Sequence, residues 1–170
     1  MRQISYPRIR ALLVLSLACL LQACSPELDW RELISPEGRF KVLMPARPSM
    51  ASGADAAGHV QNSWTAEAGP RLFSVGYTDY RDAAQLHMQP VRDALVRAVR
   101  GKLVQEVEIQ SAPAGLSLTI QGWAGDGSDR VLLVWLFPRG ARLYQLAIAA
   151  TPGSISPADS DLFLLSFKPE

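Results

Sequence analysis

The sequence predicts an α+β fold, with a mostly antiparallel sheet of about seven strands and two main helices. Residues 116–122 alternate strictly between apolar and polar side chains, as in a strand with one wet face. Residues 84–100 instead repeat their apolar side chains every three or four positions, which indicates an amphipathic helix. Residues 131–137 are apolar without alternation and predict a central strand buried on both faces. A sheet with such a strand needs helices on both sides.

The first elements form a hairpin. Residues 30–34 and 39–43 are short extended runs, and Ser35-Pro36-Glu37-Gly38 joins them with proline and glycine at positions that suit a tight turn. The next segment, Met44 to Gly58, contains two prolines and many small residues without any period. We expect it to be a long surface loop or linker.

A second hairpin and a helix follow. Residues 59–66 and 71–77 alternate and are separated by Gly69-Pro70, which predicts a turn. In the helical segment that comes next, Gly101 stands where a C-cap is expected.

The last part of the chain completes the sheet and adds the second helix. Ser156-Pro157 supplies a capping hydroxyl and a first-turn proline, so we expect a short helix to about Phe167. Four further strands are predicted before it, at residues 102–110, 116–122, 129–138 and 141–149.

The first 24 residues have the features of a signal peptide, with arginines followed by an apolar run at 11–21. That run is about half the roughly 20 residues needed to span a bilayer. Leu21-Gln22-Ala23-Cys24 resembles the bacterial lipobox, which implies cleavage before Cys24 and its acylation, for example with palmitate. An ordinary secretory peptide is the alternative. We expect residues 1–23 to be the signal peptide, 24–29 a lipidated tether and 30–170 the globular domain.

The residue after the cysteine bears on location. It is Ser25 rather than aspartate, which by resemblance to Gram-negative lipoproteins implies sorting to the outer membrane. We therefore expect a lipid-anchored domain in the cell envelope, on the periplasmic face of that membrane. Cleavage would also remove Cys19 and leave Cys24 as the one cysteine, excluding a disulfide and a thiol nucleophile.

Composition and motifs exclude several functions. Seventeen Lys and Arg against 16 Asp and Glu provide no basic field for nucleic acid. A serine nucleophile elbow and a phosphate-binding glycine motif are absent, and Gly125 to Asp129 suits a hairpin turn better than a calcium loop. Two histidines, His59 and His87, are too few for a zinc site and are expected at the surface. We expect no catalytic residue, cofactor or metal.

Tryptophans and arginines provide the remaining candidates. Trp64, Trp123 and Trp135 lie in strand patterns and are expected in the core, whereas Trp30 is expected to pack on the first hairpin. The basic side chains of the middle helix are a candidate surface for a protein or lipid partner, alongside the loop at 44–58. These side chains are Arg92, Arg97 and Arg100.

Three sequence features together resemble a known family. They are the hairpin Trp30-x3-Ile34-Ser-Pro-Glu-Gly-Arg-Phe40-Lys-Val42-x-Met-Pro45, the segment Arg142-Leu-Tyr144-Gln-Leu and the ending Phe163-x2-Ser166-Phe167. They look like bacterial lipoproteins with the PsbP/Mog-type fold, including DcrB-like proteins. The resemblance implies an α/β/α sandwich in which Phe40, Val42, Tyr144 and Phe167 are packed inside. Members of this fold include a photosystem accessory protein and a Ran-GTPase-binding protein, so the fold does not transfer a function.

Two classes of function remain open. We expect a membrane-anchored, non-enzymatic accessory module that binds a periplasmic or envelope protein, because a catalytic motif is missing. The alternative is a small hydrolase or ligand-binding protein whose site is assembled only in three dimensions.

Overall fold

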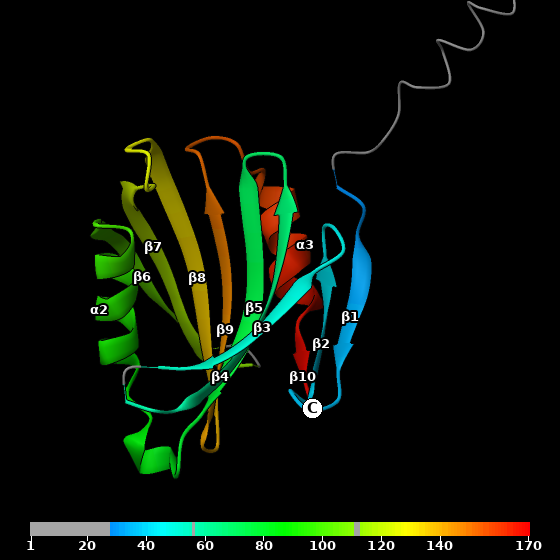
Figure 1. The fold of residues 1–170 in the computed structure, drawn as a ribbon, viewed down its shortest axis with the longest axis vertical. Helices are drawn as coiled ribbons and strands as arrows, with labels where there is room; N and C mark the ends of the chain where they lie inside the picture. The colour runs from blue at the N-terminus through cyan, green and yellow to red at the C-terminus, as the bar shows by residue number, and fades with distance from the viewer. Residues whose placement is uncertain (1–27, 56, 111–112) are drawn as a thin grey trace, which may run out of the picture.

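The computed structural model describes residues 28–55, 57–110 and 113–170, shown in Figure 1. The expected signal peptide and lipidated Cys24 lie outside the described residues. In the described part of the chain, no helix is long and apolar enough to cross a membrane.

The main element is a seven-stranded antiparallel sheet with the order β3-β4-β5-β9-β8-β7-β6. It confirms the predicted second hairpin and the four later strands. Its strands are β3 (Ser49–Ala54), β4 (Val60–Ala68), β5 (Arg71–Asp79), β6 (Lys102–Ile109), β7 (Gly115–Trp123), β8 (Asp129–Arg139) and β9 (Arg142–Ala150).

The first hairpin is also confirmed, but it belongs to a separate small sheet. In this sheet β2 (Phe40–Met44) lies between β1 (Arg31–Ser35) and the short β10 (Lys168–Pro169). In the turn of this hairpin, Arg39 has a positive φ, of 51°. Gly38 is needed for space, since a Cβ there would lie 2.5 Å from the ring of Phe40.

Two α-helices cover opposite faces of the large sheet. The helix α2 (Met88–Ala98), preceded by the 3-10 helix η1 (Ala83–Gln85), packs on one face. The helix α3 (Pro157–Ser166) and the small sheet pack on the other face (Figure 1). Between them, β8 is buried on both faces over much of its length, as predicted.

The helix ends follow the local sequence. At the start of α3, the Ser156 hydroxyl accepts a hydrogen bond from the amide of Asp159 at 3.1 Å, which confirms the predicted cap. At the end of α2 the prediction was wrong by one residue. Arg100 takes the left-handed conformation with φ of 49°, and the amide of Gly101 donates to the carbonyl of Val96 at 2.9 Å. This is a Schellman ending with arginine in the usual glycine position.

The two faces of the sheet hold two different cores. The core under α3 and the small sheet is rich in aromatic residues, and we call it the aromatic core. The core under α2 is made of aliphatic residues, and we call it the aliphatic core. The aromatic core includes Phe40, Trp64, Phe73, Tyr77, Trp135, Phe137, Tyr144, Phe163 and Phe167. The aliphatic core includes Leu116, Leu118, Ile120, Leu132, Val134, Leu136, Leu143 and Ala147.

A polar network around Arg142 joins the two sheets. Its guanidinium contacts both carboxylate oxygens of Asp79, at 2.6 and 2.8 Å, and donates to the carbonyls of Glu37 and Gly38. The same group lies 4.0 Å from the ring centre of Tyr77, and the Tyr144 hydroxyl donates to Gly38 at 2.8 Å. The network thereby fixes the turn of the first hairpin on the large sheet. Phe40, Val42, Tyr144 and Phe167 are all buried, as the family resemblance implied.

Two predictions about the surface are corrected. The segment 44–58 is not a loop throughout, because residues 49–54 form β3, which pairs with β4 in an unbroken register. All six residues of β3 are exposed, so no apolar alternation marks the strand. Trp123 is not a core residue, because half of its surface is exposed. Trp64 and Trp135 are buried as expected, and Trp30 packs edge-on against Phe73.

Candidate interaction surface

A groove opens at one end of the large sheet. It has a volume of about 1140 Å³ and lies between the start of α2, the end of β6, the start of β7 and the β8–β9 turn. Its charged and polar lining includes His87, Arg92, Glu106, Glu108 and Arg139. Its apolar lining includes Leu86, Met88, Leu116, Phe137 and Pro138.

A second hollow of about 430 Å³ continues from the groove toward α3. The two hollows share Ile109, Pro113, Phe137, Arg139 and Pro169, so they form one surface around the end of the sheet. The second hollow adds apolar side chains from the end of α3, among them Leu165, which is 75% exposed. The combined surface, here called the end groove, is mainly apolar and carries charged side chains beside α2 and at the β8–β9 turn.

Arg92 organises the charged side chains of the end groove beside α2. Its guanidinium contacts the carboxylates of Asp93 at 3.0 Å and Glu106 at 3.2 Å, and these hydrogen bonds raise its pKa. The pair with Glu106 joins the first turns of α2 to the edge strand β6 across 14 residues of sequence. Arg139 is held in a different way, because it donates to the carbonyl of Pro169 at 2.8 Å.

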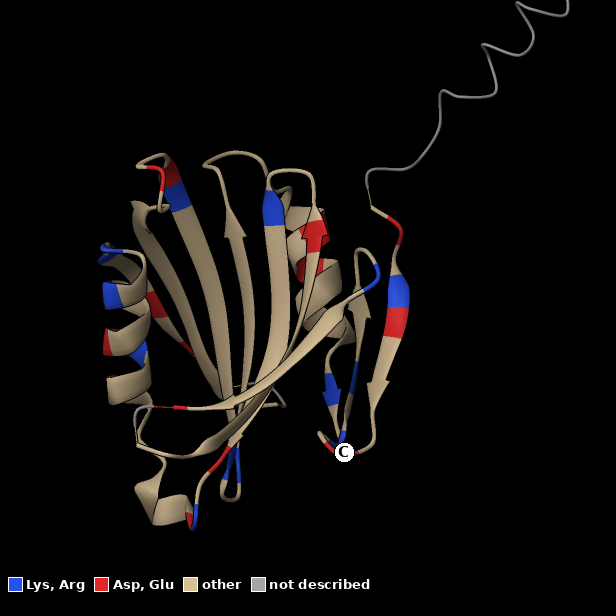
Figure 2. Cartoon of the chain, viewed as in Figure 1, with Lys and Arg blue, Asp and Glu red and all other residues tan. Residues whose placement is uncertain are grey.

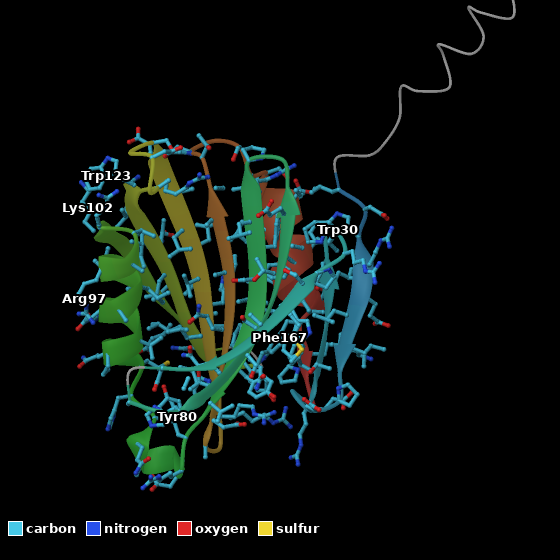
Figure 3. All side chains as sticks on the ribbon, in the orientation of Figure 1. Trp30, Tyr80, Arg97, Lys102, Trp123 and Phe167 are labelled. Atoms are coloured by element: carbon cyan, nitrogen blue, oxygen red, sulfur yellow. The ribbon has the colours of Figure 1, made fainter. Side chains whose placement is uncertain are left out.

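The three arginines of the predicted partner surface lie in three different settings. Arg92 lines the end groove, as described. Arg97 is exposed on α2 and points outward, as Figure 3 shows. Arg100 donates to the carbonyl of Ala124 at 2.9 Å, at the opposite end of α2. A shared role for them in partner binding stays a prediction.

Sequence reasoning missed a polar contact made by His59. Its Nδ1 lies 2.8 Å from Oδ2 of Asp55, and its ring packs against Tyr80 with centroids 4.5 Å apart. The His59 side chain is only 22% exposed, so it is more enclosed than the predicted surface histidine. The spacing of four residues across a turn with Gly58 was the available sequence signal.

The pKa of Asp55 is lowered in this contact. Burial alone would raise the pKa, but hydrogen bonds from the His59 side chain and from the amides of His59 and Ala57 outweigh that effect. The phenol of Tyr80 has a raised pKa, mainly through burial and secondarily through the charge of Asp55. His87 lies apart from this cluster, immediately before α2 and in the end groove.

Other predicted sites have simple structural roles. The Asp126 carboxylate accepts from the amide and hydroxyl of Ser128, and Gly127 has a positive φ, so Gly125 to Asp129 includes a hairpin turn as predicted. Within residues 28–55, 57–110 and 113–170, no group of three His, Cys, Asp or Glu side chains is placed to hold a metal ion. Trp123 and Lys102 lie near each other at the end of the molecule away from the end groove (Figure 3).

Comparison with known proteins supports the fold. No family model and no curated protein matches the chain. The solution structure of cyanobacterial PsbP (CyanoP) from Synechocystis sp. PCC 6803 is similar with a TM-score of 0.61 and 11% identity, covering 87% of this chain and 96% of that one. A crystal structure from Bacteroides thetaiotaomicron has a TM-score of 0.45 and 12% identity, and the match covers 82% of this chain and 48% of that one. A Pseudomonas aeruginosa protein of unknown function has a TM-score of 0.35 and 16% identity, and the match covers 73% of this chain and 84% of that one. The similarity to CyanoP shows that the fold is PsbP-like.

Proposed function

We propose that the chain is a lipoprotein of the outer membrane, anchored through acyl chains on Cys24, whose periplasmic domain binds an envelope protein without catalysing a reaction. The single observation that carries the binding role is the position of the end groove. Strand β1 begins toward one end of the domain, whereas the end groove lies at the other, beside the β8–β9 turn (Figure 1). A domain tethered before residue 28 would present this groove away from the membrane.

The composition of the end groove supports a protein partner. Apolar side chains such as Phe137 and Leu165 lie in the same groove as charged side chains such as Arg92 and Glu108. Apolar area bordered by charged side chains is typical of protein recognition surfaces. In the part of the chain that the structure describes, Figure 2 shows positive and negative residues interspersed over the fold, and the 17 basic against 16 acidic residues of the whole sequence do not favour nucleic acid.

Crosslinking in intact cells tests the binding role. A photoreactive residue at Gln89, which is exposed and lines the end groove, should give a discrete adduct with an envelope protein. The matched control is Gly125, which is exposed at the other end of the sheet and has open space around it. Adducts at Gly125 but not at Gln89 would contradict the proposal.

The anchor has a separate test. Cys24→Ser in the full chain should abolish acylation, measured by incorporation of labelled palmitate and by mass spectrometry. Acylation that persists in this variant, or a wild-type mature N-terminus elsewhere, would contradict the lipoprotein assignment. The crosslinking result does not depend on this outcome.

The arginine prediction can now be divided. Arg92→Gln removes a side chain that lines the end groove and should reduce the Gln89 adduct. Arg97→Gln removes an exposed charge outside the groove and should leave the adduct unchanged. Equal losses in both variants would instead support the whole basic side of α2 as the partner surface.

One observation favours the second candidate function, a small hydrolase. The His59 and Asp55 contact resembles the base and orienting carboxylate of a hydrolytic site. Hydrolysis of p-nitrophenyl acetate by the full chain, lost in His59→Ala and retained in His87→Ala, would favour this function. We expect no hydrolysis that depends on His59, because the packing of the turn accounts for its contact with Asp55.

A further inference from the structure

The two edges of the large sheet are built differently. The edge strand β6 carries Lys102, Glu106 and Glu108, and its pairing with β7 is interrupted between Leu103 and Gln105. Charges and irregular pairing are the usual protections against the addition of another strand. The opposite edge, β3, has the sequence Ser-Met-Ala-Ser-Gly-Ala, without charge, proline or bulge. It is a regular and unprotected edge.

The free backbone groups of β3 can be identified. The Asp55 amide donates to the carbonyl of His59 at 3.0 Å, so the backbone N–H and C=O of residue 55 point toward the β4 side. Backbone groups of an antiparallel strand alternate in direction along the chain. The N–H and C=O groups of Met50, Ser52 and Ala54 therefore point to the open side, where the sheet order places no neighbouring strand among the described residues.

The charges that flank β3 favour pairing with another copy of itself. Arg47, which is exposed, precedes the strand, and Asp55 follows it. In an antiparallel pair centred on Ala51, Arg47 of one copy lies opposite Asp55 of the other, at both ends of the pair. The Asp55 carboxylate already accepts from His59 and Ala57 but has capacity for one more donor, and its side chain is 26% exposed.

We propose that β3 pairs with β3 of a second copy of this chain, in the register centred on Ala51, and joins two sheets edge to edge. In this register, the backbone of Met50 exchanges hydrogen bonds with that of Ser52 in the other copy. The Ala54 amide of one copy donates to the Pro48 carbonyl of the other. Pro48 has no N–H to donate in return, but it lies at the end of the pair, where proline is tolerated in a strand.

The register predicts a specific disulfide crosslink. The two Ala51 residues form a non-hydrogen-bonded pair, where Cα atoms are about 4.5 Å apart, within the range for a disulfide. On mild oxidation of membranes that contain the full chain, Ala51→Cys should give more crosslinked dimer than the parental chain gives. Met50→Cys, one residue away and opposite Ser52, and Val107→Cys, on the protected edge, should not. Equal crosslinking at all three positions, or at Val107 alone, would overturn the proposal.

A second measurement needs no crosslink. The full chain in detergent should sediment as a dimer, and Ala51→Lys, which places two like charges opposite each other, should weaken association by about tenfold or more. Val107→Lys is the matched control and should leave association unchanged. A wild-type chain that stays monomeric at high concentration, or a dimer unaffected by Ala51→Lys, would contradict the pairing.

Discussion

The two helices are attached to the same sheet in different ways. Helix α3 inserts Phe163, which is fully buried and packs edge-on against Phe73, and its Ser166 hydroxyl accepts a hydrogen bond from the Leu43 amide of the small sheet. Helix α2 has no fully buried side chain and contacts the aliphatic core through half-buried residues such as Val91 and Leu95. The apolar area buried by each side chain sets most of its contribution to the free energy of folding. The α3 face should therefore contribute more to stability than the α2 face does.

This difference has a consequence for function. The end groove includes the start of α2 as one wall, and the ion pair of Arg92 with Glu106 and half-buried apolar contacts hold that wall. A lightly packed element can adjust to a partner at small cost in free energy. The α3 face, with the Arg142 network and the aromatic core, supplies a rigid body behind it.

The largest expected effect is on the α3 face. Phe163→Ala should lower the free energy of unfolding by about 3–5 kcal/mol, because it leaves a cavity in the aromatic core. Chemical denaturation of the full chain in detergent measures it. Leu162→Ala, which removes a 40% exposed neighbour on the same helix, should cost far less. Similar losses in both variants would contradict the assigned packing of α3.

The matching change on the other face should be smaller. Leu95→Ala on α2 should cost about 1–2 kcal/mol, because the side chain is only partly removed from water in the folded state. The same denaturation experiment applies. A loss as large as that of Phe163→Ala would show that the two helices are equally well packed.

A still smaller effect tests the junction of the two sheets. Tyr144→Phe should cost about 1 kcal/mol, the usual net value of one hydrogen bond. The Gly38 carbonyl keeps its bond from Arg142, so it is not left unpaired. A loss above that of Leu95→Ala would mean that the hydroxyl holds the first hairpin in place largely by itself.

The smallest effect concerns pH. The pKa of Asp55 is lowered in the folded protein, so its contribution to stability is present above its ordinary pKa of 3.8 and is lost as the pH falls through the folded value. Asp55→Asn should therefore reduce the acid dependence of stability below about pH 4. Chemical denaturation at pH 3 and pH 6 measures the free energy of unfolding of both proteins. The same difference between the two pH values in the wild type and in Asp55→Asn would contradict the assignment.

The sequence predicted elements with strong periodicity well and exposed elements poorly. Strand β7 and helix α2 were found because one side of each is apolar. Strand β3 was missed because none of its side chains is buried, and its stability comes from backbone pairing with β4, which leaves no pattern in the side chains. Trp123 was misplaced because it shares a face with Ser117 and Thr119, where the covering layer does not reach.

The candidate site was less accessible to sequence reasoning than the fold. Arg92 was identified as a partner residue, but its pairing with Glu106 depends on how β6 returns beside α2. Phe137 and Leu165 meet at the end groove because the end of α3 lies near the end of β8. Such long-range contacts have no fixed spacing in the sequence, so the groove becomes visible only when the chain is folded.

Hydrogen exchange on the full chain in detergent tests the contrast between the two helices most directly. Interior amides of α2, such as those of Leu95 and Val96, should exchange through openings of lower free energy than interior amides of α3, such as those of Phe163 and Leu164. Strand β8 should be at least as protected as α3. Equal protection of α2 and α3 would contradict the account of a rigid aromatic face behind an adjustable helix that borders the end groove.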